Sequence, residues 1–515
     1  MDISRETSEL IKIFLLLYAL GLVVAWRWFG EKLRRGLLIA LVVASTANYA
    51  RFGPKVPIER VDTYDLIHYY LNTKYFDELG YYDLYPAAIL VDLENGGPRY
   101  GSPSRYMAQN EAGHGYMPID HAVSEGKRVR STRFTAERWE AFEHDFLVLH
   151  RDMPGLNKTL WAELILDHGF NGTPPWTTLA EPLVRIVPVE AVKLLGYVDL
   201  LLILGGVLAL GWAYGSPTAM WAWAFFMLSY SARWPTLTWA LLRYDYVAAL
   251  MMAMAAIKKG RPWLGGILAG WSASMRLFPA LWMAFPGIKG LIGLGRKEVS
   301  KPLLRLAGGF LLSVALLQGL AIARHGVDTV QVHLENMNDH NDAMKLSSRR
   351  AGLALGIAYE GQTLPKNIDN AHRQRVDDGK PLRFALAGLA IVGMGWALRK
   401  RRDDEAFAFG FVPFFLLTTA SYYYYITRIT LVAMHAAEPE KARNRVGLCL
   451  LLGIELFCNA AETWMPGHRI FLVGWLSWGL SAYTAAMIGM LIWEQRREDA
   501  AALSATPPAS PQPAP

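Results

Sequence analysis

Runs of about twenty apolar residues recur along this chain and constrain its fold more than any other feature. Each run is long enough to cross the hydrocarbon core of a bilayer, which is roughly 30 Å thick. The 515 residues are 53% hydrophobic and only 19% charged, a combination that is unusual for a soluble domain of this length. The sequence therefore predicts an all-α, multi-pass membrane protein.

Basic residues between the apolar runs predict the topology. Lys and Arg gather at Arg34–Arg35, Lys258–Lys259 and Arg399–Arg402, and such clusters favour the cytoplasmic side of a membrane. About thirteen crossings put every cluster on that side. We expect them at about 10–29, 36–50, 193–213, 217–232, 240–257, 303–323, 382–398, 446–463 and 470–492. The segments 263–288 and 405–436 should each form an out-and-back pair, with breaks near Arg276–Pro279 and around Tyr422–Tyr425.

This topology divides the chain into six parts. They are two N-terminal crossings (1–50), an outer loop (51–190), a central bundle (191–323), a second outer loop (324–381), a C-terminal bundle (382–497) and an Ala/Pro/Ser-rich tail (498–515) that should be disordered. The segment from Ile11 to Trp28 lacks a cleavage site after a basic region, so we expect it to stay as an anchor. The net charge of +7 belongs to the loops and calls for no nucleic-acid partner.

The first outer loop is long enough to carry function. Residues 134–150 space their apolar side chains at three and four, with Thr135 as N-cap, which predicts an amphipathic helix lying along the membrane. The pair Pro174–Pro175 predicts an extended return to the membrane, with Trp176 as an anchor at its surface.

Acidic and aromatic residues are concentrated at the start of this loop, in VDTYDLIHYYLNTKYFDELGYYDLY (61–85). In a helix, Asp62, Asp65, His68 and Tyr69 lie on neighbouring turns of one face. Carboxylates and a histidine at a membrane surface are candidates for proton transfer, and the adjacent Tyr70 suits the headgroup level. The alternative is an interfacial helix whose acids are only solvated.

Three arginines lie within or beside apolar segments. Arg243, Arg276 and Arg428 all fall toward the outer end of their crossings, on the side of Asp65. Facing one cavity, they would suit a phosphate, because guanidinium groups form charge-assisted and bidentate bonds to its oxygens. The alternative is that Arg243 pairs with Asp245 or a neighbouring helix, and that Arg428 extends to the interface.

Ligands for a metal are sparse. Cys449 and Cys458 share one apolar segment and predict neither a disulfide framework nor a metal site. We expect no cofactor, although a divalent ion at Asp62 and Asp65 remains an alternative.

Several of these motifs resemble the glycosyltransferase-C superfamily of integral membrane enzymes. DTYDLIHYYLNTKYF is similar to the first-loop motif that carries the catalytic acid, with Asp–Leu–x–x–Tyr at Asp65–Tyr69. SMRLFPALW has Arg276 where relatives often have Lys, and DHGFNGTPPW, with His168, is similar to a block of a bacterial group. The nearest branch is the polyprenol-phosphate-sugar-dependent mannosyltransferases. The crossing at 10–29 departs from the pattern, because it precedes the usual first helix.

The resemblance implies a transfer of a sugar from a polyprenyl-phosphate donor to an acceptor hydroxyl of a lipid or glycan, with inversion. Asp65 would be the general base, with Asp62 and His68 orienting the acceptor or tuning it. Arg276, with Arg243 or Arg428, would hold the phosphate, and Tyr69, Tyr70, Trp176 and His168 would contact the substrates. The expected location is the inner (plasma) membrane of a bacterium, with the site on the outer, periplasmic face.

Two other functions fit the same residues. A flippase or exporter of lipid-linked sugars would use the arginines without needing a base. A ligase-like transferase acting on a diphosphate-linked glycan would instead rely on the second outer loop, which carries His333, Glu335, His340 and Arg349.

Overall fold

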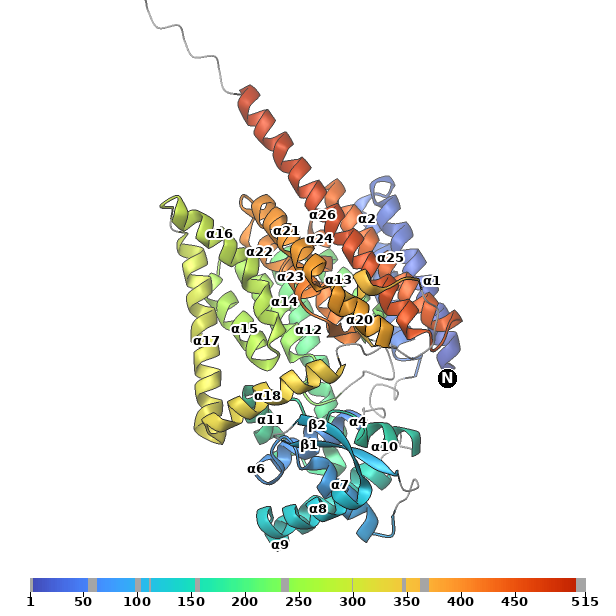
Figure 1. Ribbon diagram of the computed structural model, residues 1–515. Helices are drawn as coiled ribbons and strands as arrows, with labels where there is room; N and C mark the ends of the chain where they lie inside the picture. The colour runs from blue at the N-terminus through green and yellow to red at the C-terminus, as the bar shows by residue number, and fades with distance from the viewer. Residues whose placement is uncertain are drawn as a thin grey trace, which may run out of the picture.

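The computed structural model describes residues 3–53, 63–97, 103–110, 113–152, 158–232, 240–298, 300–344, 349–361 and 370–505. A bundle of long helices forms most of the molecule, and a smaller domain lies against one end of it (Figure 1). We call this smaller part, residues 63–186, the loop domain. The described residues are mostly helical, as predicted, and their strands form two short two-stranded sheets.

The N-terminal segment forms a helical hairpin. Its elements are α1 (Arg5–Val24), the 3₁₀-helix η1 (Ala25–Trp28) and α2 (Glu31–Tyr49). The Ser8 hydroxyl donates to the carbonyl oxygen of Asn48 at 3.3 Å, and the Asn48 amide donates to the carbonyl oxygen of Ser8 at 3.1 Å. The start of α1 and the end of α2 therefore lie together, at the end of the bundle nearer the loop domain (Figure 1).

The loop domain is a set of short helices around one β-hairpin. Strands β1 (Arg105–Asn110) and β2 (Gly113–Pro118) pair antiparallel, with Tyr106 opposite Met117. The helices are α4 (Thr63–Leu66), the π-helical turn η2 (Ile67–Leu71), α5 (Asn72–Lys74), α6 (Phe76–Leu79), α7 (Leu84–Glu94), α8 (Ile119–Arg133), α9 (Ala136–Leu147), the π-helical turn η3 (Val148–Asp152), α10 (Lys158–Ile165) and α11 (Pro174–Ile186).

Helix α9 is the amphipathic helix that the spacing predicts, but its apolar face covers protein and not lipid. Thr135 caps it, its hydroxyl oxygen accepting from the backbone N–H of Arg138 at 3.3 Å. Its apolar face packs inside the loop domain, where the ring of Phe142 is fully buried and lies 5.2 Å from that of Tyr75. In Figure 1, α9 is at the far end of the loop domain from the bundle. The apolar stripe therefore serves the core of the loop domain.

The prediction of an extended chain at Pro174–Pro175 was wrong, because both prolines belong to the first turn of α11. A helix tolerates proline there, since the first backbone N–H groups have no partner within the helix. Thr173 provides the N-cap, its side chain accepting from the backbone N–H of Trp176 at 3.2 Å. Trp176 is fully buried, which also overturns its prediction as an anchor at the membrane surface.

The bundle follows the loop domain in sequence. Its elements are the 3₁₀-helix η4 (Val189–Leu195), α12 (Gly196–Tyr214), α13 (Ser216–Leu228), η5 (Tyr230–Ala232), α14 (Asp245–Lys258), α15 (Pro262–Met275), η6 (Phe278–Met283), α16 (Ala284–Gly295), α17 (Lys301–His325), α18 (Val327–Met344), β3 (Arg350–Ala351), α19 (Leu353–Ala358), α20 (Asn370–Asp378), α21 (Lys380–Leu398), α22 (Asp403–Ala408), α23 (Phe411–Leu417), β4 (Ala420–Ser421), η7 (Tyr422–Arg428), α24 (Ile429–Ala437), α25 (Ala442–Trp464) and α26 (Arg469–Ala505).

Seven helices within the described residues are long and apolar enough to cross a membrane, so the chain is a multi-pass integral membrane protein. They span Arg5–Trp28, Val189–Tyr214, Phe278–Gly295, Lys301–His325, Lys380–Leu398, Ala442–Trp464 and Arg469–Ala501. The expected crossing at 36–50 corresponds to α2, which has 19 residues but is not among these seven, and others correspond to shorter helices such as α14, with 14 residues that are nearly all buried among neighbouring helices. The expected breaks at Arg276–Pro279 and Tyr422–Tyr425 are both present, between α15 and α16 and between α23 and α24.

Ion pairs tie the helices together at the end of the bundle away from the loop domain. Arg401 pairs with Glu498 at 2.8 Å, and Lys400 pairs with Asp499 at 2.7 Å. Both partners belong to α26, which continues as a helix to Ala505 instead of ending in a disordered tail at residue 498. The basic cluster after α21 is therefore fixed to the C-terminal helix.

Helices α15 and α17 approach each other closely because glycines line their contact. A Cβ atom on Gly266 would lie 2.1 Å from the carbonyl oxygen of Leu306, and one on Gly309 would lie 2.3 Å from that of Trp263. Small residues allow such close approach between membrane helices, where packing replaces the hydrophobic effect as the main attraction.

We expect Gly266→Ala to lower the free energy of unfolding by roughly 1–3 kcal/mol, because the new methyl group must push two helix backbones apart. Thermal unfolding of the protein in detergent measures the change. Gly319→Ala in α17 is the control, since nothing lies within 4 Å of its added Cβ. A Gly266→Ala protein as stable as the control would contradict the close packing.

Candidate functional site

The candidate site lies where the loop domain meets the bundle. Asp65 comes from α4, Tyr69 from η2 and Trp176 from α11, all in the loop domain. From the bundle come Arg243, just before α14, and Arg276, just after α15. Five residues from four distant segments of the chain thus meet at one boundary.

The central contact is an ion pair between Asp65 and Arg243. The guanidinium Nη2 of Arg243 donates to Oδ2 of Asp65, and the two side chains are 16% (Asp65) and 13% (Arg243) exposed. The alternative that Arg243 pairs with Asp245 or a neighbouring helix does not describe this contact, because its partner is Asp65 of the loop domain. The carboxylate and the guanidinium both keep limited access to solvent.

A buried aspartate fixes the segment that carries Arg243. Asp199, on α12, is fully buried and accepts from the backbone N–H groups of Arg243 at 3.1 Å and Tyr244 at 3.0 Å. These bonds hold the chain where Leu242 has a positive φ of 48°. Sequence reasoning missed Asp199, although a charge inside the apolar run GYVDLLLIL is a usable signal.

The guanidinium group of Arg276 lies beside two aromatic rings. Its guanidinium carbon lies 5.8 Å from the ring centres of both Tyr69 and Trp176. Its Nη1 donates to the carbonyl oxygen of Met275 at 3.0 Å, whereas its buried Nε has no hydrogen-bond partner among the described residues. An anion is the natural partner for such a cation with an unmet donor.

Thr173 explains why Trp176 and Arg276 meet. Its hydroxyl caps α11 and also donates to the carbonyl oxygen of Ser274 at 2.7 Å, close to the end of α15. The indole N–H of Trp176 donates to the carbonyl oxygen of Leu242 at 3.3 Å, next to Arg243. One helix start therefore connects the loop domain to both arginine-bearing segments.

The ring of Tyr69 lies beside the guanidinium group of Arg276. Burial raises the pKa of Tyr69, and the charges of Arg276, Asp65 and Arg243 all act on its hydroxyl group. That hydroxyl donates to the side-chain oxygen of Asn171. The charges of Asp65, Arg243 and Arg276 thus all reach one hydroxyl group.

Three other predicted residues lie within the interior of the loop domain. Nδ1 of His68 lies 3.0 Å from the carbonyl oxygen of Tyr64, and Nε2 lies 2.7 Å from the hydroxyl of Tyr85. Burial lowers the pKa of His68, so its neutral ring donates from Nδ1 and accepts at Nε2. The Tyr70 hydroxyl donates to the carbonyl oxygen of Val187 at 2.9 Å, and His168 is buried.

These contacts make His68 and Tyr70 supports for the helix that carries Asp65. Asp62 lies outside the described residues.

Arg428 is apart from this group. It is fully buried, and its Nη2 pairs with Oε1 of Glu455 at 2.7 Å. Its Nε donates to the carbonyl oxygen of Tyr425 at 2.8 Å. Glu455 also accepts from the backbone N–H of Tyr230 and the hydroxyl of Ser229. Arg428 is neither at the interface nor beside Asp65, so we leave it out of the candidate site.

Helix α18 lies between the loop domain and the other helices of the bundle (Figure 1). The amide of Asn336 donates to the carbonyl oxygen of Phe170 at 3.1 Å. His333 is 3% exposed, its ring centre is 5.5 Å from that of Tyr81, and neither ring nitrogen has a hydrogen-bond partner among the described residues. Burial lowers the pKa of His333 to about 4, and the charge of Arg276 acts in the same direction. His333 therefore borders the candidate site as a neutral ring.

Within the described residues, no group of three or more His, Cys, Asp or Glu side chains could hold a metal ion. Comparison of the chain with known protein families, curated proteins and solved structures gives no match. The chemistry of the site is therefore interpreted from its own residues.

We expect the free energy of unfolding to fall as the pH decreases from about 6.5 toward 4, in part because of His333. Between these pH values the His333 ring is protonated in the unfolded chain but stays neutral in the folded protein, so acid favours unfolding. His333→Leu should weaken this dependence in denaturant unfolding at a series of pH values. Gln331→Leu, an exposed position on the same helix, should keep it. Equal pH dependence in His333→Leu and the wild type would contradict the assignment.

Proposed function

We propose that this chain is a membrane glycosyltransferase that moves a sugar from a polyprenyl-phosphate donor to a hydroxyl group of an acceptor. One observation carries the proposal: Asp65 forms an ion pair with Arg243, and the guanidinium of Arg276 lies 5.8 Å from the ring centre of Tyr69, four residues after Asp65, at the boundary between bundle and loop domain. A base for a hydroxyl group and a cation for a phosphate are the two groups that such a transfer needs.

Each group has a role in this scheme. Asp65 takes the proton from the acceptor hydroxyl, whose oxygen attacks the anomeric carbon. The bond from that carbon to the phosphate oxygen breaks, and the phosphate leaves with the electron pair on the face opposite to attack, which inverts the centre. Arg276 stabilises the charge that develops on the phosphate. Arg243 orients the carboxylate of Asp65 by its ion pair.

The position of the site supports a donor that is carried by a lipid. The bundle contains the membrane-crossing helices, and the loop domain covers one end of it (Figure 1). A cover of this kind excludes water that would otherwise intercept the reacting sugar. The aromatic rings of Tyr69 and Trp176 offer faces suited to a sugar ring as well as to Arg276.

We infer further that the loop domain lies on the outer, periplasmic side of a bacterial inner membrane. The support is the distribution of charge, because Arg399–Arg402 lie at the opposite end of the bundle from the loop domain and are paired there with α26. Short loops rich in Arg and Lys favour the cytoplasmic side.

Asp65→Asn tests the role of the base. We expect transfer to fall by about 10²–10⁴-fold, because the amide cannot accept the proton, while binding of the donor is retained. The assay follows release of bare polyprenyl phosphate from several polyprenyl-phosphate sugars with purified protein. Asp120→Asn, an exposed acid of the loop domain, is the control. A sugar exporter would tolerate Asp65→Asn, so full transport activity and no transfer would favour that function instead.

Arg276→Gln tests the role of the cation. We expect donor binding to weaken by about tenfold to a hundredfold, because charge-assisted bonds to the phosphate are lost. Arg276→Lys should restore only part of it, since an ammonium group cannot form the bidentate contact. Titration with a polyprenyl-phosphate sugar measures the affinity. Unchanged binding in Arg276→Gln would remove Arg276 from the proposed mechanism.

A further inference from the structure

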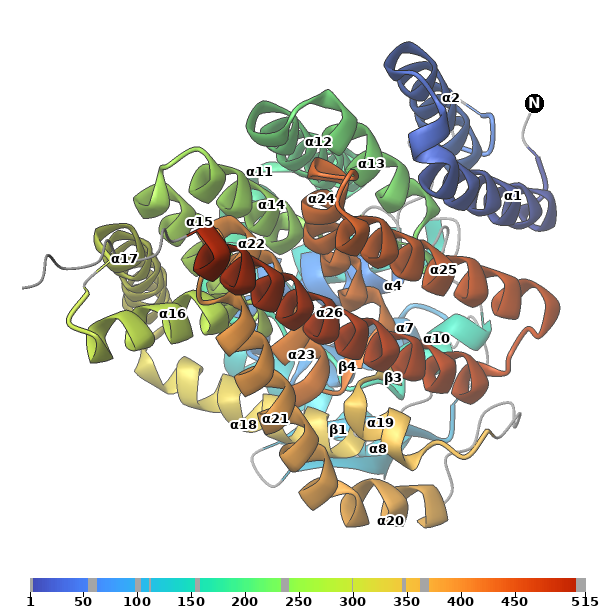
Figure 2. The same ribbon diagram turned by 90° about the horizontal axis from the view of Figure 1, so that it is seen from above.

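The run of four tyrosines at Tyr422–Tyr425 marks the break in the apolar segment 405–436. It opens the 3₁₀-helix η7, which connects β4 to α24. In the view from above, β4 is near the centre of the molecule and not at its edge (Figure 2). The break therefore brings a group of aromatic side chains into the interior of the bundle.

Hydrogen bonds of the backbone fix this run at both ends. Strands β3 and β4 pair just before it, and the backbone N–H of Tyr422 donates to the carbonyl oxygen of Arg349 at 2.8 Å. The carbonyl oxygen of Tyr422 accepts from the hydroxyl of Ser231 at 2.8 Å. The carbonyl oxygen of Tyr425 accepts from Nε of Arg428 at 2.8 Å. The fold therefore sets the direction of each tyrosine.

The two outer tyrosines of the run pack against neighbouring segments. The ring centre of Tyr422 lies 5.0 Å from that of Tyr230, next to α13. Tyr425 is fully buried, and its hydroxyl donates to the carbonyl oxygen of Ala351 at 2.7 Å. Tyr422 and Tyr425 thus serve the packing of the turn.

The two inner tyrosines, Tyr423 and Tyr424, are only partly buried. Their ring centres lie 4.4 Å apart, and their hydroxyl groups interact with each other. In contrast to Tyr425, neither hydroxyl bonds to the backbone of a residue that the structure describes. A phenol group that the backbone does not use can donate a hydrogen bond to a ligand and accept one from it.

The ring of Tyr424 lies against both segments that carry the arginines of the candidate site. It is 4.9 Å from the ring centre of Phe278, two residues after Arg276. It is 6.1 Å from the ring centre of Tyr246, three residues after Arg243. The rings of Phe278 and Tyr246 are themselves 5.6 Å apart. Tyr424 therefore lies where these two segments approach each other.

The groups of the candidate site also reach the inner tyrosines electrostatically. Tyr69 and Tyr424 both act on the guanidinium of Arg276. Asp65 and Tyr69 both act on the hydroxyl of Tyr423. The pair Tyr423–Tyr424 is thus close to the base and to the cation of the proposed transfer.

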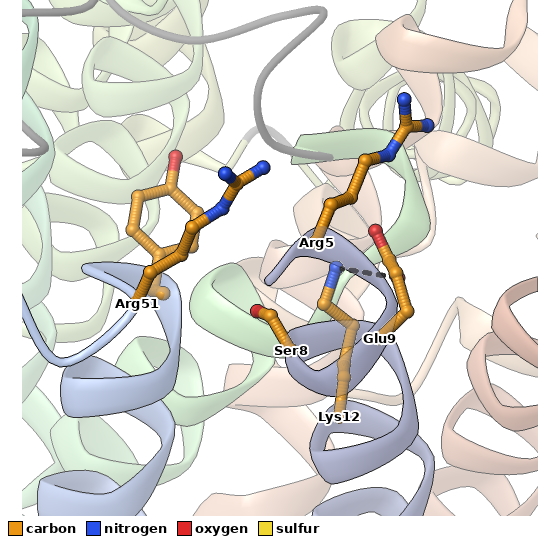
Figure 3. Close-up of a pocket in the computed structure, with 6 residues that line it drawn as sticks. Arg5, Ser8, Glu9, Lys12 and Arg51 are labelled. Carbon is orange, nitrogen blue, oxygen red and sulfur yellow. Dashed lines mark ion pairs between the residues drawn. The ribbon is translucent and has the colours of Figure 1, made fainter. Parts of the chain in front are cut away.

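A pocket between α1 and α2 offers no alternative place for a sugar. It has room for about one water molecule, and within it Lys12 lies 3.4 Å from Glu9. Its lining residues are Arg5, Ser8, Glu9, Lys12, Tyr49 and Arg51 (Figure 3). A sugar ring is larger than this space.

We propose that Tyr423 and Tyr424 bind the sugar ring of the lipid-linked donor. This inference rests on the proposed function, in which the sugar lies between the phosphate held by Arg276 and the acceptor hydroxyl activated by Asp65. The aromatic faces pack on the C–H groups of the sugar, and the phenol groups form hydrogen bonds with its hydroxyl groups.

The test compares two kinds of lipid that carry the same charge. One kind is a panel of polyprenyl-phosphate hexoses and pentoses, and the other is a polyprenyl phosphate whose sugar is replaced by a methyl group. Affinities are measured for the full-length protein in nanodiscs. We expect at least one sugar-bearing lipid to bind more tightly than the methyl ester. A wild-type protein without this preference would contradict the sugar subsite.

Tyr423→Phe and Tyr424→Phe each remove one hydroxyl group and keep the ring. We expect each to weaken binding of the preferred sugar-bearing lipid by about twofold to tenfold, because a hydrogen bond to the sugar is lost. Binding of the methyl ester should stay unchanged. Tyr425→Phe removes one hydroxyl from the same run and is the matched control, since its hydrogen bond goes to Ala351. It should leave both affinities unchanged.

Thermal unfolding in detergent shows that the three variants are folded. Equal weakening for both kinds of lipid, no weakening in either inner variant, or an equal effect of Tyr425→Phe would overturn the inference. A sugar preference that depends on Tyr423 and Tyr424, found without any transfer of sugar, would contradict the proposed reaction and leave the subsite standing. Transfer by the wild type, with an unchanged sugar preference in both inner variants, would mean the reverse.

Discussion

The arrangement of the candidate site depends on one buried carboxylate. Asp199 sits in an apolar helix and accepts two backbone N–H groups from the segment before α14. A buried carboxylate is tolerated when such donors satisfy it, and here the donors belong to a chain that must turn sharply at Leu242. The turn directs Arg243 toward the loop domain, where it meets Asp65. Without Asp199, neither the turn nor the ion pair would have a fixed geometry.

The buried arginines of this protein differ in whether a carboxylate forms an ion pair with them. Arg428 and Arg443 are fully buried and paired with Glu455 and Glu405, respectively, within the bundle. Such pairs connect helices and neutralise the charge of the arginine, although one N–H group or more of each guanidinium keeps no hydrogen-bond partner among the described residues. Arg276 has aromatic rings and one carbonyl oxygen around it, and no carboxylate of the described residues forms an ion pair with it, although the charge of Asp245 acts on it. A cation solvated mainly by π-faces retains most of its capacity to bind an anion.

The sequence was sufficient for features that depend on local rules. Long apolar runs predicted the membrane class, Thr135 predicted the start of α9, and Arg276–Pro279 predicted a break between two helices. Each follows from hydropathy, capping or proline geometry within a few residues. The association of Asp65 with the arginines was predicted only as a common side of the membrane. Which arginine would reach it depends on long-range packing.

The failures have physical reasons of the same kind. The apolar stripe of α9 could have covered a membrane or a protein core, and periodicity does not distinguish the two. Pro174–Pro175 was interpreted as a helix breaker, although the first turn of a helix accepts proline when a residue such as Thr173 caps it. Arg428 was grouped with Arg243 by depth alone, because its partner Glu455 lies in a different helix. The two backbone N–H groups that donate to Asp199 could be identified only from the folded structure.

The π-helical turn at Ile67–Leu71 has a consequence for how this region can change. A wide turn of this type accommodates an extra residue, which rotates everything after it by about 100° relative to the preceding turns. The angular positions of Asp65, before the turn, and Asn72, after it, therefore do not follow one regular helical repeat, although the segment is continuous. Deleting a single residue there would leave a regular, well-formed helix, yet it would point the acid or the tyrosines the wrong way. We therefore expect this stretch to tolerate substitutions better than insertions or deletions.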